Sequence, residues 1–151
     1  MLDRRTVMMS GGAMLALGGC LGPSGPGAVT ISATGSAGMN TGPDGSDRPL
    51  TLTIVQLRGA GSFDNADFFA LQDPASALGG DLVKSDQLVL SAGQSAQKIV
   101  GVEEGTAFIG VIAGFRQPGG KVFRAKVPAP ASGDAGIVVT VGGGGISLQS
   151  A

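Results

Sequence analysis

The segment Leu50-Thr51-Leu52-Thr53-Ile54-Val55-Gln56-Leu57 decides the fold expected for this chain of 151 residues. Large apolar residues alternate with threonine up to Ile54, a pattern typical of a β-strand with one buried face. Seven further segments, separated by turns rich in glycine and proline, have strand-like patterns: residues 29–33, 86–90, 94–102, 107–115, 121–127, 137–141 and 146–148. About eight short strands at this spacing predict an all-β sandwich of antiparallel strands.

One short helix is expected between the second and third strands. Asp64 is placed to cap its first turn, with Asp67 three residues later, and Phe63 can pack against Phe68 as a hydrophobic staple. Pro74 limits the helix because the residue before a proline avoids the helical conformation. The sequence therefore predicts a sandwich with one inserted helix. The segment 107–115 is apolar on both faces apart from its glycines, which predicts a central strand.

The composition excludes several classes of function. The chain has no histidine, so it lacks the commonest general base near neutral pH and a leading ligand of transition metals. Its net charge of −1 argues against nucleic acid as a partner, because such binding depends on basic side chains. Its single cysteine cannot form an internal disulfide. This composition favours a binding or scaffolding domain, and we expect no enzyme activity.

The first 20 residues have the pattern of a bacterial lipoprotein signal. A basic start precedes an apolar stretch, residues 7–17, that is shorter than the roughly 20 residues needed to span a bilayer. The sequence Leu17-Gly18-Gly19-Cys20 resembles a lipobox, the site of cleavage and lipid attachment. We therefore expect a signal peptide over residues 1–19, a lipid-modified Cys20 in a flexible tether over residues 20–28, and one domain over residues 29–151.

The expected lipids on Cys20 are a diacylglycerol and an N-acyl chain, which together hold a protein stably at a membrane. The residue after Cys20 is Leu21, and not the aspartate that would resemble an inner-membrane retention signal. The periplasmic face of the outer membrane is therefore the expected location. Two alternatives stay open. Arg4 and Arg5 resemble a twin-arginine export signal but also suit the charged start of a general signal. The apolar stretch is alternatively a buried amino-terminal helix.

A long connection separates the first two strands. Residues 34–49 are rich in glycine, asparagine, aspartate, serine and proline, with Met39 as almost the only large apolar side chain. Loops of this length inside compact domains are usually functional or disordered. The sequence therefore marks this connection as the first candidate for a functional segment.

Other clusters have structural explanations. Gly59-Ala60-Gly61 and the glycines at 142–145 lack the lysine and hydroxyl residue of a phosphate loop, so nucleotide binding is not expected. Five aspartates offer oxygens to calcium, but their spacing misses the EF-hand pattern: Asp44, Asp47, Asp64, Asp67 and Asp73. Four phenylalanines are interpreted as core residues: Phe68, Phe69, Phe108 and Phe115. We expect no catalytic residues, no metal site and no cofactor besides the lipid.

Several of these segments together resemble the outer-membrane lipoprotein family of the type VI secretion system, TssJ (also VasD or SciN). Val55-Gln56-Leu57, followed by residues 63–71, is similar to the family's strand-to-helix segment. Asp81-Leu82 with residues 86–90 and Gly93 resembles its next block, and residues 109–116 resemble its central strand. The resemblance covers nearly all of the chain after Cys20, with the weakest match after Pro130.

The resemblance implies a transthyretin-like β-sandwich with an added helix. It also implies an anchoring role at the outer membrane, in which the loop between the first two strands binds the periplasmic carboxyl-terminal domain of TssM within the TssJ–TssL–TssM membrane complex. The loop residues that this role falls on are Met39, Asn40, Thr41, Gly42, Pro43, Asp44, Gly45, Ser46, Asp47 and Arg48. The polar residues suggest polar contacts, and Met39 is an alternative hot spot.

A second interpretation is a periplasmic lipoprotein that binds a small ligand or carbohydrate. Sandwich domains often do so through exposed aromatic side chains, whereas this chain has only six phenylalanines, most of them in core-like patterns. A third interpretation is a purely structural role in the envelope. If the protein has the anchoring role, we expect it to have no small-molecule substrate.

Overall fold

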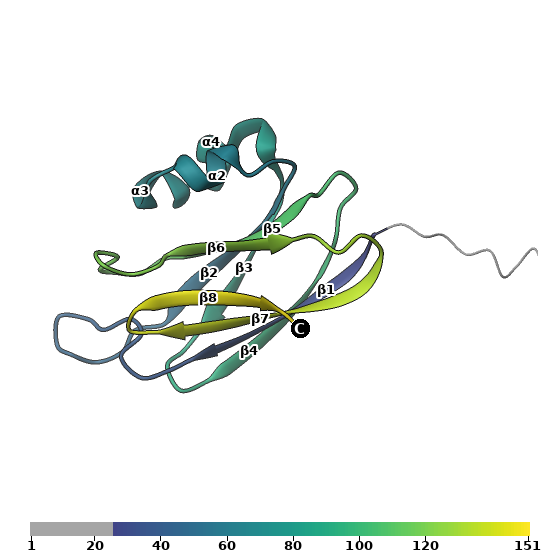
Figure 1. Cartoon of the computed structure of the whole chain (residues 1–151). Coiled ribbons are helices and arrows are strands. Elements are labelled where there is room, and N and C mark those ends of the chain that lie inside the picture. Colours follow the sequence, from purple (N-terminus) through teal and green to yellow (C-terminus); the bar gives the residue numbers. More distant parts are fainter. Residues whose placement is uncertain (1–25) are drawn as a thin grey trace, which may run out of the picture.

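The computed structural model describes residues 26–151, which form two β-sheets and a helical layer (Figure 1). The elements are β1 (Pro26–Gly35), β2 (Leu50–Leu57), α2 (Gly61–Asn65), α3 (Phe68–Leu71), α4 (Pro74–Leu78), the 3-10 helix η2 (Gly79–Asp81), β3 (Leu82–Leu90), β4 (Ser95–Gly101), β5 (Phe108–Ala113), β6 (Arg124–Pro128), β7 (Gly133–Gly142) and β8 (Gly145–Ser150).

The two sheets have the strand orders β4-β1-β7-β8 and β3-β2-β5-β6, which confirms the predicted sandwich. All neighbouring strands are antiparallel except β1 and β7, which pair in parallel. This exception arises because β7 enters its sheet from the same end as β1, after the chain has passed through the other sheet (Figure 1). The predicted central strand is confirmed, since β5 lies between β2 and β6.

The main core lies between the two sheets and follows the predicted alternation. Leu50, Leu52 and Ile54 point inward from β2 and are fully buried. They pack with the inward residues of the other strands, which include Val29, Ile31, Leu90, Ile109, Val111, Val139 and Val141. Strand β3 begins four residues before its predicted start. Its first part, which includes the exposed Lys84 and Ser85, lies at a sheet edge and lacks an apolar pattern, so the sequence did not mark it as a strand.

A second apolar cluster joins the helical layer to the outer face of the β3-β2-β5-β6 sheet. Its buried members are Val55, Leu57, Phe63, Leu71, Leu78 and Ile112. Three come from β2 and β5, so these two strands are buried on both faces. The ring of Phe63 lies directly over Gly110 in β5, where a Cβ atom would approach the ring to 2.9 Å. A glycine at this position therefore lets the helical layer sit close to the sheet.

The helical insertion consists of short pieces instead of the one predicted helix. The backbone of Ala66 is extended between α2 and α3, which divides the segment. The predicted cap at Asp64 is wrong. Asp67 caps α3 instead, and its side chain accepts a hydrogen bond from the Ala70 N–H at 2.7 Å. Asp64 lies inside α2 and pairs with Lys126 of β6 at 2.9 Å.

The phenylalanines divide between core and surface. Phe115 is buried as predicted, and Phe68 and Phe108 are partly buried. The core prediction is wrong for Phe69, whose side chain is 78% exposed. The physical reason is the break at Ala66, because α3 starts anew there and turns Leu71 instead of Phe69 toward the sheet.

Gln56 is a buried polar residue that links the two sheets. It occupies an inward position of β2, where its Nε2 donates to the Gly101 carbonyl of β4 at 2.8 Å. Its Oε1 accepts hydrogen bonds from the Glu103 N–H and the Thr106 hydroxyl. A buried amide with such partners avoids the desolvation penalty of an unpaired group. The side chain therefore ties β2 to the β4–β5 connection.

The connections between strands lie at two opposite ends of the sandwich. The β1–β2, β3–β4, β5–β6 and β7–β8 connections lie together at the end where β1 finishes (Figure 1). The start of β1 lies at the opposite end (Figure 1). The long connection of residues 36–49 therefore points away from the end at which the chain enters the domain.

Replacing Gly110 with alanine tests the close contact between the sheet and the helical layer. The added methyl group meets the buried Phe63 ring and the Val55 side chain, at 2.9 and 3.1 Å from the Cβ position. We expect Gly110→Ala to lower the free energy of unfolding by about 1–3 kcal/mol, as overpacking does in other cores. Urea denaturation measures this change. Gly101→Ala in β4 is the matched control, because no atom lies within 4 Å of its added Cβ; equal stability of the two variants would contradict the proposed contact.

Candidate partner-binding surface

The base of the loop at residues 36–49 is packed against the domain. Both the N–H and the hydroxyl of Ser36 donate to the Val141 carbonyl of β7. The Met39 side chain is fully buried in the main core, and its sulfur lies against Gly35. The Gly38 N–H donates to the Asp47 carboxylate at 3.0 Å across the loop. Because its base is held at several points, the loop has one defined shape.

Asn40 holds the loop to a second connection. It is only 3% exposed, and its Nδ2 donates to the Pro49 carbonyl at 3.1 Å. Its Oδ1 accepts a hydrogen bond of 2.9 Å from the Arg116 N–H in the β5–β6 connection. Its backbone carbonyl accepts from the Arg48 N–H at 2.7 Å. Asn40 therefore fixes both strands of the loop base and joins them to the neighbouring connection.

The tip of the loop is a tight turn stabilised by its own polar groups. Thr41 and Asp47 form an antiparallel bridge, and Gly45 adopts a positive φ of 82°, a conformation that favours glycine. The Asp44 carboxylate accepts hydrogen bonds from the Ser46 hydroxyl at 2.8 Å and from the Ser46 N–H at 3.1 Å. Arg48 reaches the same carboxylate at 3.2 Å, but both side chains are exposed, so this ion pair adds little stability.

The contacts at the tip change the acidity of Asp44. The Ser46 hydroxyl, the Ser46 N–H and finally Arg48 stabilise the carboxylate and lower the pKa of Asp44 below its usual value of 3.8. The stabilising contribution is complete above the pKa of the unfolded chain. It is lost as the pH falls through the lower pKa of the folded state. The turn therefore keeps its polar contacts at any pH near neutrality.

The structure divides the predicted loop residues into two groups. Residues 43–48 are exposed, and Thr41 and Gly42 are partly exposed. Met39 and Asn40 are buried, so their side chains position the loop and have almost no surface to offer a partner in this conformation. The other predicted site residues, Cys20 with its lipid and the export residues Arg4 and Arg5, lie outside the described residues, as does most of the predicted tether.

Two residues outside the loop support it and were missed by the sequence prediction. The Arg116 backbone binds Asn40, and Lys121 donates from Nζ to the Met39 carbonyl at 3.1 Å. The Lys121 ammonium also lies 4.8 Å from the centre of the Phe115 ring. They lie more than 70 residues from their partners in the loop, and no local pattern marks them. The turn at residues 117–120 was predicted, but its contact with the loop was not.

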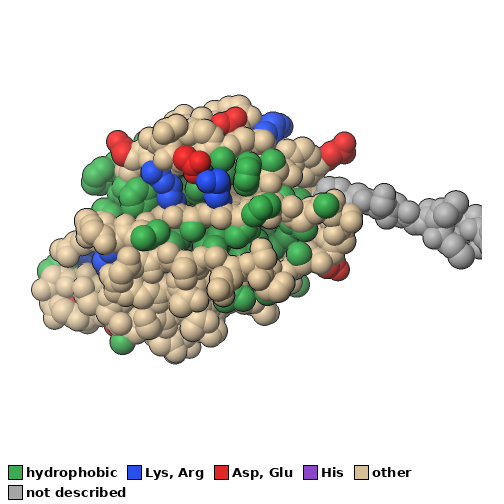
Figure 2. All heavy atoms as spheres, in the orientation of Figure 1, with side chains coloured by type: hydrophobic (Ala, Val, Ile, Leu, Met, Phe, Trp, Pro, Cys, Tyr) green, Lys and Arg blue, Asp and Glu red, His purple; other side chains and the backbone are tan. Residues whose placement is uncertain are grey.

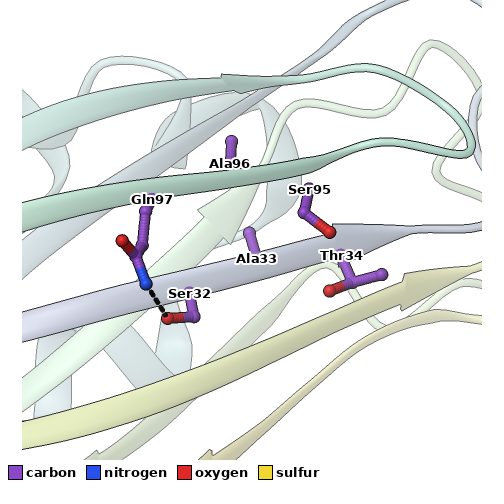
Figure 3. A pocket seen from close by; sticks show the side chains of 6 residues that line it. All are labelled: Ser32, Ala33, Thr34, Ser95, Ala96 and Gln97. Carbon is purple, nitrogen blue, oxygen red and sulfur yellow. Dashed lines mark hydrogen bonds between the residues drawn. The ribbon is translucent and has the colours of Figure 1, made fainter.

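A shallow depression between β1 and β4 is the candidate site for the alternative function, binding of a small ligand. It has a volume of about 310 Å³ and is lined by Ser32, Ala33, Thr34, Ser95, Ala96 and Gln97. Gln97 and Ser32 point toward each other across it and form a hydrogen bond of 3.1 Å (Figure 3). Small-molecule sites usually combine aromatic walls with a few polar groups. The lining of this depression contains no aromatic or charged side chain, so it offers little to a carbohydrate or an ionic ligand.

The described region offers neither a metal-binding cluster nor a membrane-spanning helix. Within residues 26–151, no cluster of three or more histidine, cysteine, aspartate or glutamate side chains is arranged to hold a metal ion. No helix in the same region is long and apolar enough to cross a membrane.

These features define a β-sandwich with a helical layer and a rigid, exposed loop at one end. A family model, "Type VI secretion lipoprotein, VasD, EvfM, TssJ, VC_A0113", matches residues 27–144. The chain belongs to this family of type VI secretion lipoproteins, and the resemblance seen in its sequence is confirmed. The match ends before β8. A comparison with curated proteins gave no match.

Several solved structures share the fold. The T6SS lipoprotein TssJ1 from Pseudomonas aeruginosa is 28% identical, with a TM-score of 0.75 over 83% of this chain and 97% of that chain. Lip from Serratia marcescens, a membrane-bound component of the type VI secretion system, is 26% identical with a TM-score of 0.75 over 82% of this chain and 98% of that one. A structure described as "T6SS protein TssM C-terminal domain (869-1107) from EAEC" holds a chain of similar fold, with 22% identity and a TM-score of 0.66 over 82% and 98%.

Substituting Ser46 tests the network at the loop tip. In Ser46→Ala the hydroxyl that contributes most to the low pKa of Asp44 is lost, so we expect that pKa to rise toward 3.8. Arg48→Gln removes the smallest of the stabilising contacts and should raise the pKa less. Titration of the Asp44 carboxyl carbon by NMR measures both changes. A larger rise in Arg48→Gln than in Ser46→Ala would show that the ion pair, and not the turn, controls the carboxylate.

Proposed function

We propose that this protein is the lipid-anchored subunit of a type VI secretion membrane complex and binds the periplasmic carboxyl-terminal domain of TssM through the loop at residues 36–49. The main support for this proposal is the structure of the loop, which has a buried, hydrogen-bonded base and an exposed polar tip. Family membership and the occurrence of this fold in a structure described by the TssM carboxyl-terminal domain support the choice of partner.

The order within the loop supports binding. A segment that is already fixed loses less conformational entropy when it meets a partner, so more of the contact energy appears as affinity. Asn40 and Met39 supply this order from below, while residues 43–48 present carboxylate, hydroxyl, guanidinium and backbone groups above. The partner surface that fits such a tip is polar, with donors for Asp44 and Asp47 and acceptors for Arg48.

The anchoring half of the proposal comes from the amino-terminal sequence. Cys20 is the last residue of a lipobox-like sequence, and acyl chains on its sulfur and amino group would hold the protein at the inner leaflet of the outer membrane. The chain enters the domain at the end opposite to the loop (Figure 1). This arrangement leaves the loop directed away from the attachment point. In this role the protein makes and breaks no covalent bond after its maturation.

Shortening the loop tests the proposed partner contact. Thr41 and Asp47 already pair as in a hairpin, so residues 42–46 can be replaced by a two-residue Asn-Gly turn without disturbing the buried base. We expect this variant to fold normally and to lose TssM binding, because the exposed tip is gone. Isothermal titration calorimetry with the chain from Leu21 onward and the periplasmic domain of TssM from the same organism measures the affinity.

A double variant of Glu103 and Glu104 to serine is the matched control for this experiment. Both side chains are exposed in the β4–β5 connection, at the opposite end of the sandwich from the loop. This variant should bind TssM as the unmodified protein does. If the shortened loop binds with unchanged affinity, the loop is not the contact; if the unmodified protein does not bind at all, TssM is not the partner.

Cys20→Ser tests the lipid anchor. Serine offers no thiol for acylation, so the variant should leave the domain folded and move it from the membrane fraction to the soluble fraction of the cell. Fractionation followed by immunoblotting measures the distribution, and a Ser24→Ala variant in the tether serves as the control. A Cys20→Ser protein that still sediments with membranes would contradict the lipobox assignment.

A further inference from the structure

An exposed aromatic group lies on the helical layer. Phe69 of α3 is 78% exposed, the largest exposed fraction among the large hydrophobic residues that the structure describes as exposed. Scattered apolar residues are normal on a protein surface, but grouped ones often mark an interaction site. The Phe69 ring packs edge-on against Phe68, at 5.4 Å between centres, and Phe68 packs in the same way against Phe123 at 5.3 Å. Val122, the residue just before Phe123 in the sequence, is also exposed.

The helical layer holds this aromatic group firmly in place. The Arg124 guanidinium donates to the carbonyls of Phe63 and Ala66 at the end of α2 and lies 5.1 Å from the Phe123 ring. Asp67 caps α3 just before Phe68. Because these contacts already fix the rings, little conformational entropy is lost when a partner binds them, which is typical of binding hot spots. Figure 2 shows hydrophobic side chains gathered where the helical layer meets β6, beside lysine and arginine side chains.

The aromatic group is continuous with the loop at residues 36–49. The β5–β6 connection joins them, because Arg116 and Lys121 bind the loop base and Val122-Phe123 leads directly to the aromatic rings. In Figure 1, α3 and this connection lie at the same end of the molecule as the loop. The polar loop tip and Phe69 therefore lie at the same end of the domain, and the β5–β6 connection links the segments that carry them.

We infer that Phe69, with Phe68 packed beside it, is a second contact for the protein that binds the loop, and that its ring enters an apolar pocket on that partner. This inference rests on the proposed function, since the partner is the periplasmic domain of TssM. The combination of a polar tip and a preorganised apolar anchor suits one partner that covers both. The loop supplies polar contacts, and Phe69 supplies the buried apolar area that a stable interface needs.

The other exposed apolar residues provide the control. Ile99 is 69% exposed and lies on the outer face of β4, in the other sheet, where its paired residue is Thr30. Removing its side chain takes away a similar amount of apolar surface far from the loop. Phe69→Ala and Ile99→Ala are therefore matched in chemistry and differ in position. Both residues are mostly exposed, so both variants should keep the unfolding temperature of the unmodified protein within a few degrees.

Calorimetric titration of the chain from Leu21 onward with the periplasmic domain of TssM tests the inference. We expect Phe69→Ala to weaken binding by about tenfold or more, the effect of removing a hot-spot aromatic, and Ile99→Ala to bind as the unmodified protein does. Unchanged affinity in Phe69→Ala, with loss of binding on shortening the loop, overturns this inference and leaves the proposed function intact. Equal weakening in both variants overturns it as well, because the effect is then not specific to the position.

Two further outcomes would also overturn this inference. If the unmodified protein does not bind TssM while it remains folded, the proposed function fails and this inference fails with it. Sedimentation velocity of the unmodified protein alone tests for a second copy as the occupant. Self-association that Phe69→Ala abolishes and Ile99→Ala does not would assign the aromatic surface to contact between copies of this chain, and would overturn the inference.

Discussion

Burial of β2 and β5 on both faces is the constraint on which the rest of the structure depends. Their inward residues, such as Ile54 and Val111, form the core between the sheets, while Val55 and Ile112 pack under the helices. Helices of four or five residues are not stable alone in water. Burial of Phe63 contributes about 1.5–3 kcal/mol and helps to hold the layer on the sheet. The absence of a side chain at Gly110 is what makes this close packing possible.

Two buried amide side chains fasten the opposite ends of the sandwich. Gln56 joins β2 to β4 and the β4–β5 connection, and Asn40 joins the loop at residues 36–49 to the β5–β6 connection. Each amide uses both its donor and its acceptor, so neither leaves a buried group unpaired. The difference lies in what each end then exposes. The end fixed by Asn40 carries the loop at residues 36–49, the longest connection between strands that contains no helix, and the Asp44 carboxylate at its tip binds groups of the loop itself.

Local patterns predicted the strands well because alternation records which face of a strand is buried. Leu50–Leu57 has the predicted bounds, and β4, β5, β6 and β8 lie close to theirs, whereas β3 and β7 each begin four residues before their predicted starts. The pattern failed where distant residues decide the outcome. It could not show that Ala66 interrupts the helix, that β1 pairs in parallel with β7, or that Phe69 remains exposed. In the loop, the sequence marked Met39 and Asn40 as candidates but not their burial, because Lys121 and Arg116 reach them from another connection.

The placement of the two ends also determines how the domain would carry load under the proposed function. A pull between the lipid on Cys20 and a partner on the loop enters at the start of β1 and leaves at its end, where residues 36–49 begin. Strand β1 is flanked by β4 on one side and β7 on the other, so it is hydrogen-bonded along both edges. A force directed along such a strand acts on its ladder of hydrogen bonds together, whereas a force across an edge strand opens them one after another. The inner position of β1 therefore suits a domain that links a membrane anchor to a partner, and the buried base of the loop extends that rigid path to the contact surface.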